Sequence, residues 1–578
     1  MEAITSFGPT FGSQFSLRSR TNSTWESKLS RSLRTSSKPG KLVRLKATPP
    51  THTFVDPESS RTSVRPHTNS AYLSPSQWGD LFLSLSDDVS EMNALERDFE
   101  TLKSKVRETF MSRSQGIEES KTRVDDMMIG EDDLYKVSII FWVFRTYGHN
   151  MSSDVFKRFQ GNNGKFKESL VGNVKGMLSL YEAAHLGTRT ESIMDEALSF
   201  ASSHLKKLSG GGNLPFHMSR QIENALHISQ HRNLELVVVV EFIRFYEQEV
   251  DHDEVLLKFS KLNFNFLQLH YQQELEILTK WNKDMDFASN LPPFYRDRIV
   301  EMHFFMPAMF FEPQSSRARI MITKFYALMT IIDDTYDRYA SIHDAESLTD
   351  SLERLDPDDA MDKQPDYCKF IFKFIMETFK DFESEFGSDS MKPTLEEFKA
   401  LLKGSLNLAK WAQASHVPSF EDYLEIAEGE HTVCTSMAAI LMGMKQIPTH
   451  EAYDWFKSKP KLVRTLGIKA RLMNDIIGFK DDMDRGYVSN GINCYMNQYG
   501  VTEKEAIREL RKMITEADKI LNEEILKNII VPRRVWNVAL GIARAVNFTC
   551  SASDDQYNNP KGKIKEYIIS LFVKKIRL

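Results

Sequence analysis

The chain has 578 residues, more than one ordinary hydrophobic core accommodates, so two domains are expected. Hydrophobic residues make up 41% of the sequence and charged residues 27%, a balance typical of folded globular proteins rather than disordered ones. The formal net charge of −6 argues against a nucleic-acid-binding protein, which usually carries a basic surface.

The cysteines and the apolar runs exclude further classes. The four cysteines occur without CxxC spacing, which argues against a disulfide framework or a structural zinc site and suits a reducing compartment. The longest apolar run, residues 320–332, is too short to span a membrane and contains Lys324. We therefore expect no membrane span.

The first segment differs in composition from the rest of the chain. Residues 1–46 contain nine Lys and Arg residues, only Glu2 and Glu26 as acids, and many Ser and Thr residues. Because this segment is basic, poor in acids and without a continuous apolar stretch, it is typical of an organelle transit peptide rather than a secretory signal. We interpret residues 1–55 as a transit peptide and linker, with a disordered basic tail as the alternative.

The remaining chain follows the helical period almost throughout. Apolar residues recur at helical spacing, or form strongly apolar stretches, in residues 95–110, 138–145, 191–208 and 234–245. Three consecutive glycines at 210–212 and Pro215 interrupt the pattern. Strand-like alternation is rare, so we predict an all-α protein with one helical domain over residues 56–255 and a second over residues 256–578.

The first acidic motif directly follows the apolar residues 320–332. Asp333, Asp334 and Asp337 form a DDxxD pattern, and about 3.6 residues per helical turn make Asp333 and Asp337 point the same way. Carboxylates at this spacing repel one another unless a cation neutralises them, and Mg²⁺ bound to a diphosphate prefers such oxygen ligands. The pattern therefore indicates a metal site, with solvated acids at a helix end as the alternative.

A second polar motif lies on the helix expected to begin near Lys461. Asn474, Gly478 and Asp482 are each four residues apart and form one stripe along that helix. An amide and a carboxylate, with water filling the gap at Gly478, could hold another metal ion. Two such stripes facing one cavity would neutralise the charge that develops on a diphosphate leaving group. A solvated helix face is the alternative.

Three arginines accompany these motifs. Arg296 and Arg298 precede the first motif, and Arg471 lies beside the second. Guanidinium groups suit bidentate contacts with phosphate oxygens. Each arginine alone is more often a surface residue, but their order relative to both acidic motifs favours diphosphate binding.

These motifs, in this order and spacing, resemble those of the plant class I terpene synthase family, over roughly residues 65–578. The resemblance also includes Arg65-Pro66, Pro75 to Asp80, Phe311 to Pro313, Ser316 to Arg319, Arg485-Gly486 and Asp554 to Tyr557. It implies an N-terminal helical α-barrel, a relic of a class II cyclase without its chemistry, and a C-terminal class I isoprenoid synthase helical bundle. It further implies an enzyme that ionises an isoprenoid diphosphate and guides the resulting carbocation.

The resemblance implies roles for individual residues. The metal site would comprise Asp333, Asp334, Asp337, Asn474, Gly478 and Asp482, although the middle aspartate of the first motif need not touch a metal. It would hold three Mg²⁺ ions with substrate bound, with Mn²⁺ as an alternative. Substrate binding would involve Arg296, Asp333, Asp337, Arg471 and Asn474. The catalytic set would be Arg296, Arg298, Arg471, Tyr557 and Phe305, with Asp555 helping to close the pocket.

Aromatic side chains near the motifs are candidates for stabilising a carbocation through their ring faces. These candidates are Phe304, Phe305 and Tyr336, and core packing is the alternative for the two phenylalanines. The chain also departs from the family pattern, which usually has Ser or Thr at Gly478, Glu at Asp482 and often Trp at Phe305. Arg65 is followed by Pro66 rather than by a second arginine, which weighs against a C10 substrate.

The resemblance leaves the length of the substrate open. A plastid leader favours C20 geranylgeranyl or C25 geranylfarnesyl diphosphate, as in similar diterpene and sesterterpene synthases of the mustard family, and C15 farnesyl diphosphate is the alternative. The leader predicts the chloroplast stroma, and we expect a monomer.

Other classes of protein are less consistent with the sequence. A class II cyclase needs an N-terminal DxDD acid, but the only DxDD string is Asp356 to Asp359, which we interpret as an exposed turn. A chain-elongating prenyltransferase would normally have two full DDxxD motifs, and this chain has one. A non-catalytic helical scaffold would have no reason to combine two acidic stripes with these arginines.

Overall fold

The structure is a computed structural model that describes residues 76–85, 89–114, 131–211, 214–293, 295–356, 359–430, 432–444, 449–527, 531–550, 556–557 and 560–578. The predicted transit peptide lies outside these ranges. So do Arg65-Pro66 and Asp554-Asp555, and Pro357-Asp358 of the DxDD string. No helix in the described ranges is long and apolar enough to cross a membrane.

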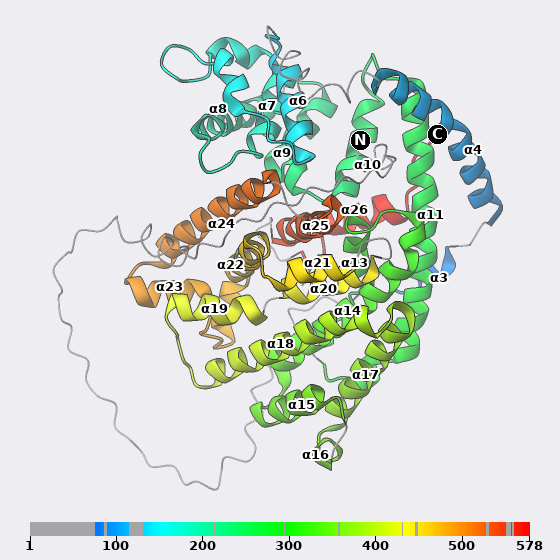
Figure 1. The fold of residues 1–578 in the computed structure, drawn as a ribbon, viewed down its shortest axis with the longest axis vertical. Helices are drawn as coiled ribbons and strands as arrows, with labels where there is room; N and C mark the ends of the chain where they lie inside the picture. The colour runs from blue at the N-terminus through cyan, green and yellow to red at the C-terminus, as the bar shows by residue number, and fades with distance from the viewer. Residues whose placement is uncertain are drawn as a thin grey trace, which may run out of the picture. The chain divides into compact units, whose positions relative to one another are not determined.

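Nearly all of the described chain is helical (Figure 1). The N-terminal helices are α3 (Leu81–Ser84), α4 (Val89–Ser114), α6 (Leu134–Thr146), α7 (Val174–Ala184), α8 (Ser192–Ser209), α9 (Phe216–His227) and α10 (Glu235–Tyr246). The next group is α11 (Glu254–Met285), α12 (Phe287–Asn290), α13 (Ile299–Phe305), α14 (Ser316–Asp334), α15 (Ile342–Arg354), α16 (Asp359–Asp362), α17 (Asp366–Phe386) and α18 (Ser388–Gln413). The last are α19 (Phe420–Glu430), α20 (Thr432–Gly443), α21 (Thr449–Lys457), α22 (Lys461–Asp484), α23 (Gly491–Tyr499), α24 (Glu503–Leu526), α25 (Arg533–Cys550) and α26 (Lys563–Phe572).

Short turns of other helix types connect these elements. The 3₁₀ turns are η2 (Ser153–Phe159), η3 (Glu168–Gly172), η4 (Gln230–Arg232), η5 (Met306–Ala308) and η6 (Pro313–Ser315), and η7 (Thr335–Tyr339) is a π-turn. The described ranges contain no β-strand, only one isolated bridge between Gln160 and Phe166. The all-α prediction is therefore confirmed, and α4, α6, α8 and α10 cover the four segments that the periodicity predicted.

Helices α6 to α9 enclose a hydrophobic core of their own. Val137, Phe141, Leu180, Ala197 and Ile222 are fully buried in it, and all its buried members lie between Leu134 and Ala225. These helices gather in the cyan part of Figure 1. This core ends at Ala225, and the next buried apolar residue, Ile228, belongs to a second core. The predicted domain boundary near residue 255 lies after this point and remains a prediction.

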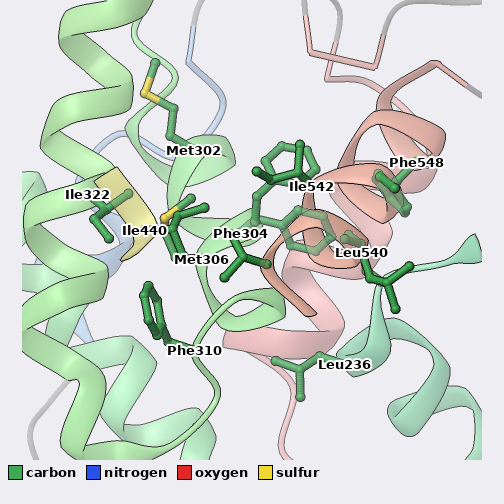
Figure 2. Packing of buried hydrophobic residues seen from close by; sticks show 14 of the residues in the cluster. Leu236, Met302, Phe304, Met306, Phe310, Ile322, Ile440, Leu540, Ile542 and Phe548 are labelled. Atoms are coloured by element: carbon green, nitrogen blue, oxygen red, sulfur yellow. The ribbon is translucent and has the colours of Figure 1, made fainter. Parts of the chain in front are cut away.

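A second, larger core joins helices from both parts of the chain. α10 and α11 contribute to it together with α13, α14, α20, α22, α25 and α26, and Trp78 and Phe82 reach it from the start of the described chain. Figure 2 shows part of this core, with Phe304 of α13, Met306 of η5 and Phe548 of α25 among its side chains. This core supports α13, α14 and α22, the helices beside or within the predicted motifs.

Buried polar contacts tie α22 to its neighbours. The Lys469 ammonium donates to Asp518 Oδ1 of α24 and to Asn547 Oδ1 of α25, each at 2.6 Å. Asn547 Nδ2 donates to the Arg232 carbonyl at 3.0 Å, and the Arg232 guanidinium lies 3.0 Å from Asp518. These bonds satisfy a lysine that is 1% exposed, so the helix with the second motif is held in a defined position.

Candidate active site

The first acidic motif straddles a change of helix type. Asp333 and Asp334 end α14, and Asp337 lies in the π-turn η7, where the Ala340 amide donates to the Thr335 carbonyl at 2.8 Å. Single π-turns inside or at the end of α-helices occur frequently at functional sites. The uniform helical spacing predicted for Asp333 and Asp337 is therefore wrong. Asp333 is exposed, whereas Asp334 is buried and Asp337 half-buried.

Among the predicted metal ligands, Asp334 has the surroundings that suit this role least. Its two carboxylate oxygens accept hydrogen bonds from Arg296 Nε and Arg296 Nη2, both at 2.8 Å. Both side chains are at least 95% buried, and Arg338 lies 3.4 Å from the same carboxylate. Because Arg296 engages both oxygens, this geometry makes Asp334 the partner that orients Arg296, not a group open to a metal ion.

The second motif lies on α22 and faces the first. Asn474 is exposed, and Asn490 Nδ2 donates to Asp482 Oδ2 at 2.7 Å. Burial, followed by the negative charge of Asp337, raises the pKa of Asp482 to about 6. Since a carboxylate of the first motif acts on one of the second, the structure brings together the two motifs that the sequence separates by about 140 residues.

Two arginines that the sequence analysis did not assign join the motifs. Arg485 donates to Asp337 Oδ2 at 2.9 Å, to Asp481 Oδ2 at 2.9 Å and to Asp482 Oδ1 at 2.7 Å. Arg338 donates to Asp481 Oδ2 at 3.1 Å. We call Arg338 and Arg485 the arginine clasp. In the sequence, Arg338 follows Asp337 by one residue and Arg485 follows Asp482 by three. The helical period, however, does not show which carboxylate an arginine contacts.

Arg471 is held beside the second motif by a buried acid. Its Nε donates to Asp475 Oδ1 at 2.8 Å, and the Tyr423 hydroxyl donates to both oxygens of Asp475. Asp475 and Tyr423 are fully buried, while the Arg471 side chain remains 11% exposed. Asp475 thus fixes the orientation of Arg471, whose predicted contact with diphosphate stays a prediction.

The C-terminal Tyr557 lies against the first arginine pair, and its predicted role in the site stays a prediction. Arg298 Nε donates to the Tyr557 carbonyl at 3.1 Å, and the Tyr557 hydroxyl lies 2.8 Å from Thr330 Oγ1. The Arg296 guanidinium carbon lies 5.4 Å from the centre of the Tyr557 ring. A cavity of about 10 Å³ beside these arginines, lined also by Asn282, Tyr295 and Asp334, has room for about one water molecule.

The aromatic candidates separate into different environments. Phe304 is 2% exposed, and its ring centre lies 5.3 Å from that of Phe305 and 5.4 Å from that of Phe548, so core packing accounts for it. Phe305 is 9% exposed, at the edge of the same core. The Tyr336 prediction is wrong, because its hydroxyl lies 2.6 Å from Thr349 Oγ1 of α15 and its ring belongs to a separate buried cluster.

The chemistry of the donors fits a hard divalent cation. Asp333 and Asn474 are exposed, and the Asp337 and Asp482 side chains keep 23% and 15% exposure, all with oxygen donors. Gly478 supplies no side-chain oxygen, and a Cβ there would lie 3.6 Å from Asp482 Oδ2, an ordinary contact distance. In the described ranges, no three His, Cys, Asp or Glu side chains converge as a complete metal site.

Two family models match the chain. The terpene synthase N-terminal domain matches residues 117–226, and the metal-binding domain of the terpene synthase family matches residues 283–520. Both acidic motifs and all three predicted arginines lie within the second match.

Relatives match over almost the whole length. Terpenoid synthase 9 of Arabidopsis thaliana is 51% identical, with 99% of each chain covered. (Z)-gamma-bisabolene synthase 2 of the same plant is 42% identical, over 88% of this chain and 97% of its own. The crystal structure of isoprene synthase from grey poplar leaves (Populus x canescens), in complex with three Mg²⁺ ions and dimethylallyl-S-thiolodiphosphate, has a TM-score of 0.73 at 26% identity, with 86% of this chain and 95% of that chain covered. This chain belongs to the terpene synthase family, whose class I fold and metal-binding domain it carries, and it is a lyase.

Proposed function

We propose that this enzyme ionises and cyclises a C20 or C25 prenyl diphosphate, with Mg²⁺, to a di- or sesterterpene and inorganic diphosphate. The observation that carries the proposal is the approach of Asp337 to Asp482, close enough for one guanidinium group to donate to both. Two carboxylates that are far apart in the sequence, one in η7 and one on α22, lie close together here. This arrangement suits a substrate that binds together with several cations.

The metal-holding residues would be Asp333, Asp337, Asn474 and Asp482, with water in the gap at Gly478. When bound, Mg²⁺ ions neutralise the charge that develops on the departing diphosphate. Asp334 lies outside this set because it holds Arg296.

The arginines of the site bind the anion and keep it away from the cation. Arg296 and Arg298 lie beside the first motif, and Arg471 lies beside the second. Their orientation is set in advance by Asp334, the Tyr557 carbonyl and Asp475, so little reorganisation is needed during the reaction. The final proton needs no dedicated base, because an oxygen of the released diphosphate can accept it.

The proposed number of carbons in the substrate rests on the predicted leader and on how much of this chain each relative matches. Terpenoid synthase 9 matches along 99% of both chains, whereas 97% of (Z)-gamma-bisabolene synthase 2 is matched by only 88% of this chain. A segment of this chain without a counterpart in the second protein, such as the predicted leader, would account for that difference. A leader that directs the enzyme to the plastid stroma supports C20 or C25 substrates. Because bisabolene is a C15 product, farnesyl diphosphate is the alternative.

Product analysis tests the proposal. Protein beginning near residue 50 is incubated with Mg²⁺ and each of the C10, C15, C20 and C25 diphosphates, and hydrocarbons are identified by gas chromatography with mass spectrometry. We expect a C20 or C25 product that disappears with EDTA. A C15 product alone would contradict the proposed C20 or C25 substrate but would still support the proposed type of reaction. Folded protein that releases no diphosphate from any substrate would contradict the enzymatic proposal.

Restoring a hydroxyl at Gly478 is expected to improve metal binding. A side chain there meets Asp482 at an ordinary contact distance, and serine favours the helix more than glycine does. We expect Gly478→Ser to lower the Mg²⁺ concentration for half-maximal diphosphate release about threefold to tenfold, because one added polar contact contributes roughly 1 kcal/mol. Gly172→Ser, at a position with nothing within 4 Å, is the control and should change nothing. A higher Mg²⁺ requirement for Gly478→Ser would show that water serves better there.

A further inference from the structure

Arg485 occupies the space between the predicted ligands of the two motifs. Each of its three guanidinium nitrogens donates to a different carboxylate: Nη1 to Asp337, Nε to Asp481 and Nη2 to Asp482. Asp337 belongs to the π-turn η7, and the other two acids belong to α22. A single side chain thus joins the two motifs, and it does so through oxygens that would also bind a metal.

The contacts leave little freedom to these oxygens. Asp482 Oδ2 accepts from Asn490, so its Oδ1, at 2.7 Å, faces Arg485. Arg485 Nη1 lies 2.9 Å from Asp337 Oδ2, and the Arg485 side chain is only 9% exposed. A divalent ion that used the same two oxygens would lie within a few ångströms of the guanidinium group, and at that distance two cations repel strongly. A divalent ion on these two oxygens and this position of Arg485 therefore exclude each other.

The other member of the arginine clasp reinforces this arrangement. Arg338 donates to Asp481 Oδ2, the oxygen that also accepts from Arg485 Nε. It lies 3.4 Å from Asp334 and 3.8 Å from Asp337. The clasp thus places positive charge beside Asp337, Asp481 and Asp482.

We propose that Arg485 is a positioning residue that takes the place of a divalent ion in the metal-free enzyme and gives up that place only when diphosphate arrives. The inference rests on the proposed function. A guanidinium that leaves Asp337 and Asp482 needs another anion, and the diphosphate that arrives with the metal is such an anion. Binding of metal without diphosphate therefore competes with Arg485, whereas binding of both satisfies every charge. Arg485 thus couples metal binding to the presence of substrate.

Binding of Mn²⁺ to the full chain tests this coupling. Free Mn²⁺ is measured by electron paramagnetic resonance during titration, with and without inorganic diphosphate, for the wild type and for Arg485→Gln. We expect Arg485→Gln to bind Mn²⁺ at least about tenfold more tightly than the wild type without diphosphate, and to gain less from diphosphate. An affinity that is unchanged or weaker without diphosphate would overturn the inference.

Matched variants separate this outcome from a general loss of structure. Arg508→Gln removes an arginine whose side chain is 64% exposed on α24 and should leave Mn²⁺ affinity unchanged. Arg485→Lys keeps the charge and should stay close to the wild type. If Arg485→Gln does not fold, Arg338→Gln weakens the same clasp and should raise the affinity by a smaller factor, and no increase there counts against the inference. Wild type that binds no Mn²⁺ even with diphosphate would refute the proposed function itself.

Discussion

Replacing Asp333 and Asp337 together with alanine is expected to lower diphosphate release by about a thousandfold or more. The loss of charge stabilisation at the leaving group corresponds to roughly 4 kcal/mol in the activation barrier. Asp333 is exposed and Asp337 half-buried, so neither side chain supports a hydrophobic core and the variant should fold. Release of diphosphate is measured with each prenyl diphosphate at saturating Mg²⁺, and circular dichroism checks the helical content.

The control for this variant removes two acids outside the motifs. Asp350 of α15 and Asp362 of α16 are exposed, so Asp350→Ala with Asp362→Ala changes the net charge by the same amount. This control should keep the wild-type rate. If the Asp333 and Asp337 variant retained more than a tenth of the rate, the first motif would not be the metal site and the proposed function would fail.

The helices were largely predictable because their signal is local. Apolar residues at spacings of three and four mark the buried face of a helix whatever it packs against, and α4, α8 and α10 follow that rule. The π-turn after Asp334 was not predictable in this way. Nothing in the spacing of Asp333, Asp334 and Asp337 shows that the helical repeat changes between Asp334 and Asp337.

The partners of the site residues were less predictable, because each pair depends on the tertiary fold. Arg296 and Asp334 were both recognised, but their mutual contact joins residues 38 positions apart and changes the role of the aspartate. Tyr336 was a candidate by proximity in sequence, yet its side chain points to Thr349. Arg485 was noticed as part of a motif without a function, since its function lies in a contact 148 residues away.

A buried ion cluster connects three helices near the site. Glu274 of α11 and Arg319 of α14 are 1% and 0% exposed, and Arg319 Nε donates to Glu274 Oε2 at 2.9 Å. His303 of α13 lies 3.1 Å from the same oxygen. Arg319 also donates to the carbonyls of Phe310 and Glu312, so it fixes the chain that enters α14. Removing one partner would leave a buried charge uncompensated.

Glu274→Ala is expected to lower the free energy of unfolding by about 3–5 kcal/mol, because the Arg319 guanidinium would remain buried without its carboxylate. Burial raises the pKa of Glu274, but hydrogen bonds from Arg319 and His303 outweigh burial and lower the pKa to about 2. A carboxyl group with a lowered pKa in the folded state stabilises the protein above its unfolded pKa, near 4.5, and this stabilisation is lost as the pH falls toward 2.

Urea denaturation at pH 7 measures this effect, with Glu276→Ala as the control. Glu276 lies on the same helix and pairs with Lys280, whose side chain is 62% exposed, so its loss should cost less than about 1 kcal/mol. Glu274→Gln keeps the shape of the side chain and its hydrogen-bond acceptor but loses the charge. Its free energy of unfolding should therefore lie between those of Glu274→Ala and Glu276→Ala. The difference between wild type and Glu274→Ala should shrink as the pH falls from 4.5 toward 2. If the two alanine variants were equally stable at pH 7, Arg319 would have to find other partners, and the chain entering α14 would not depend on Glu274.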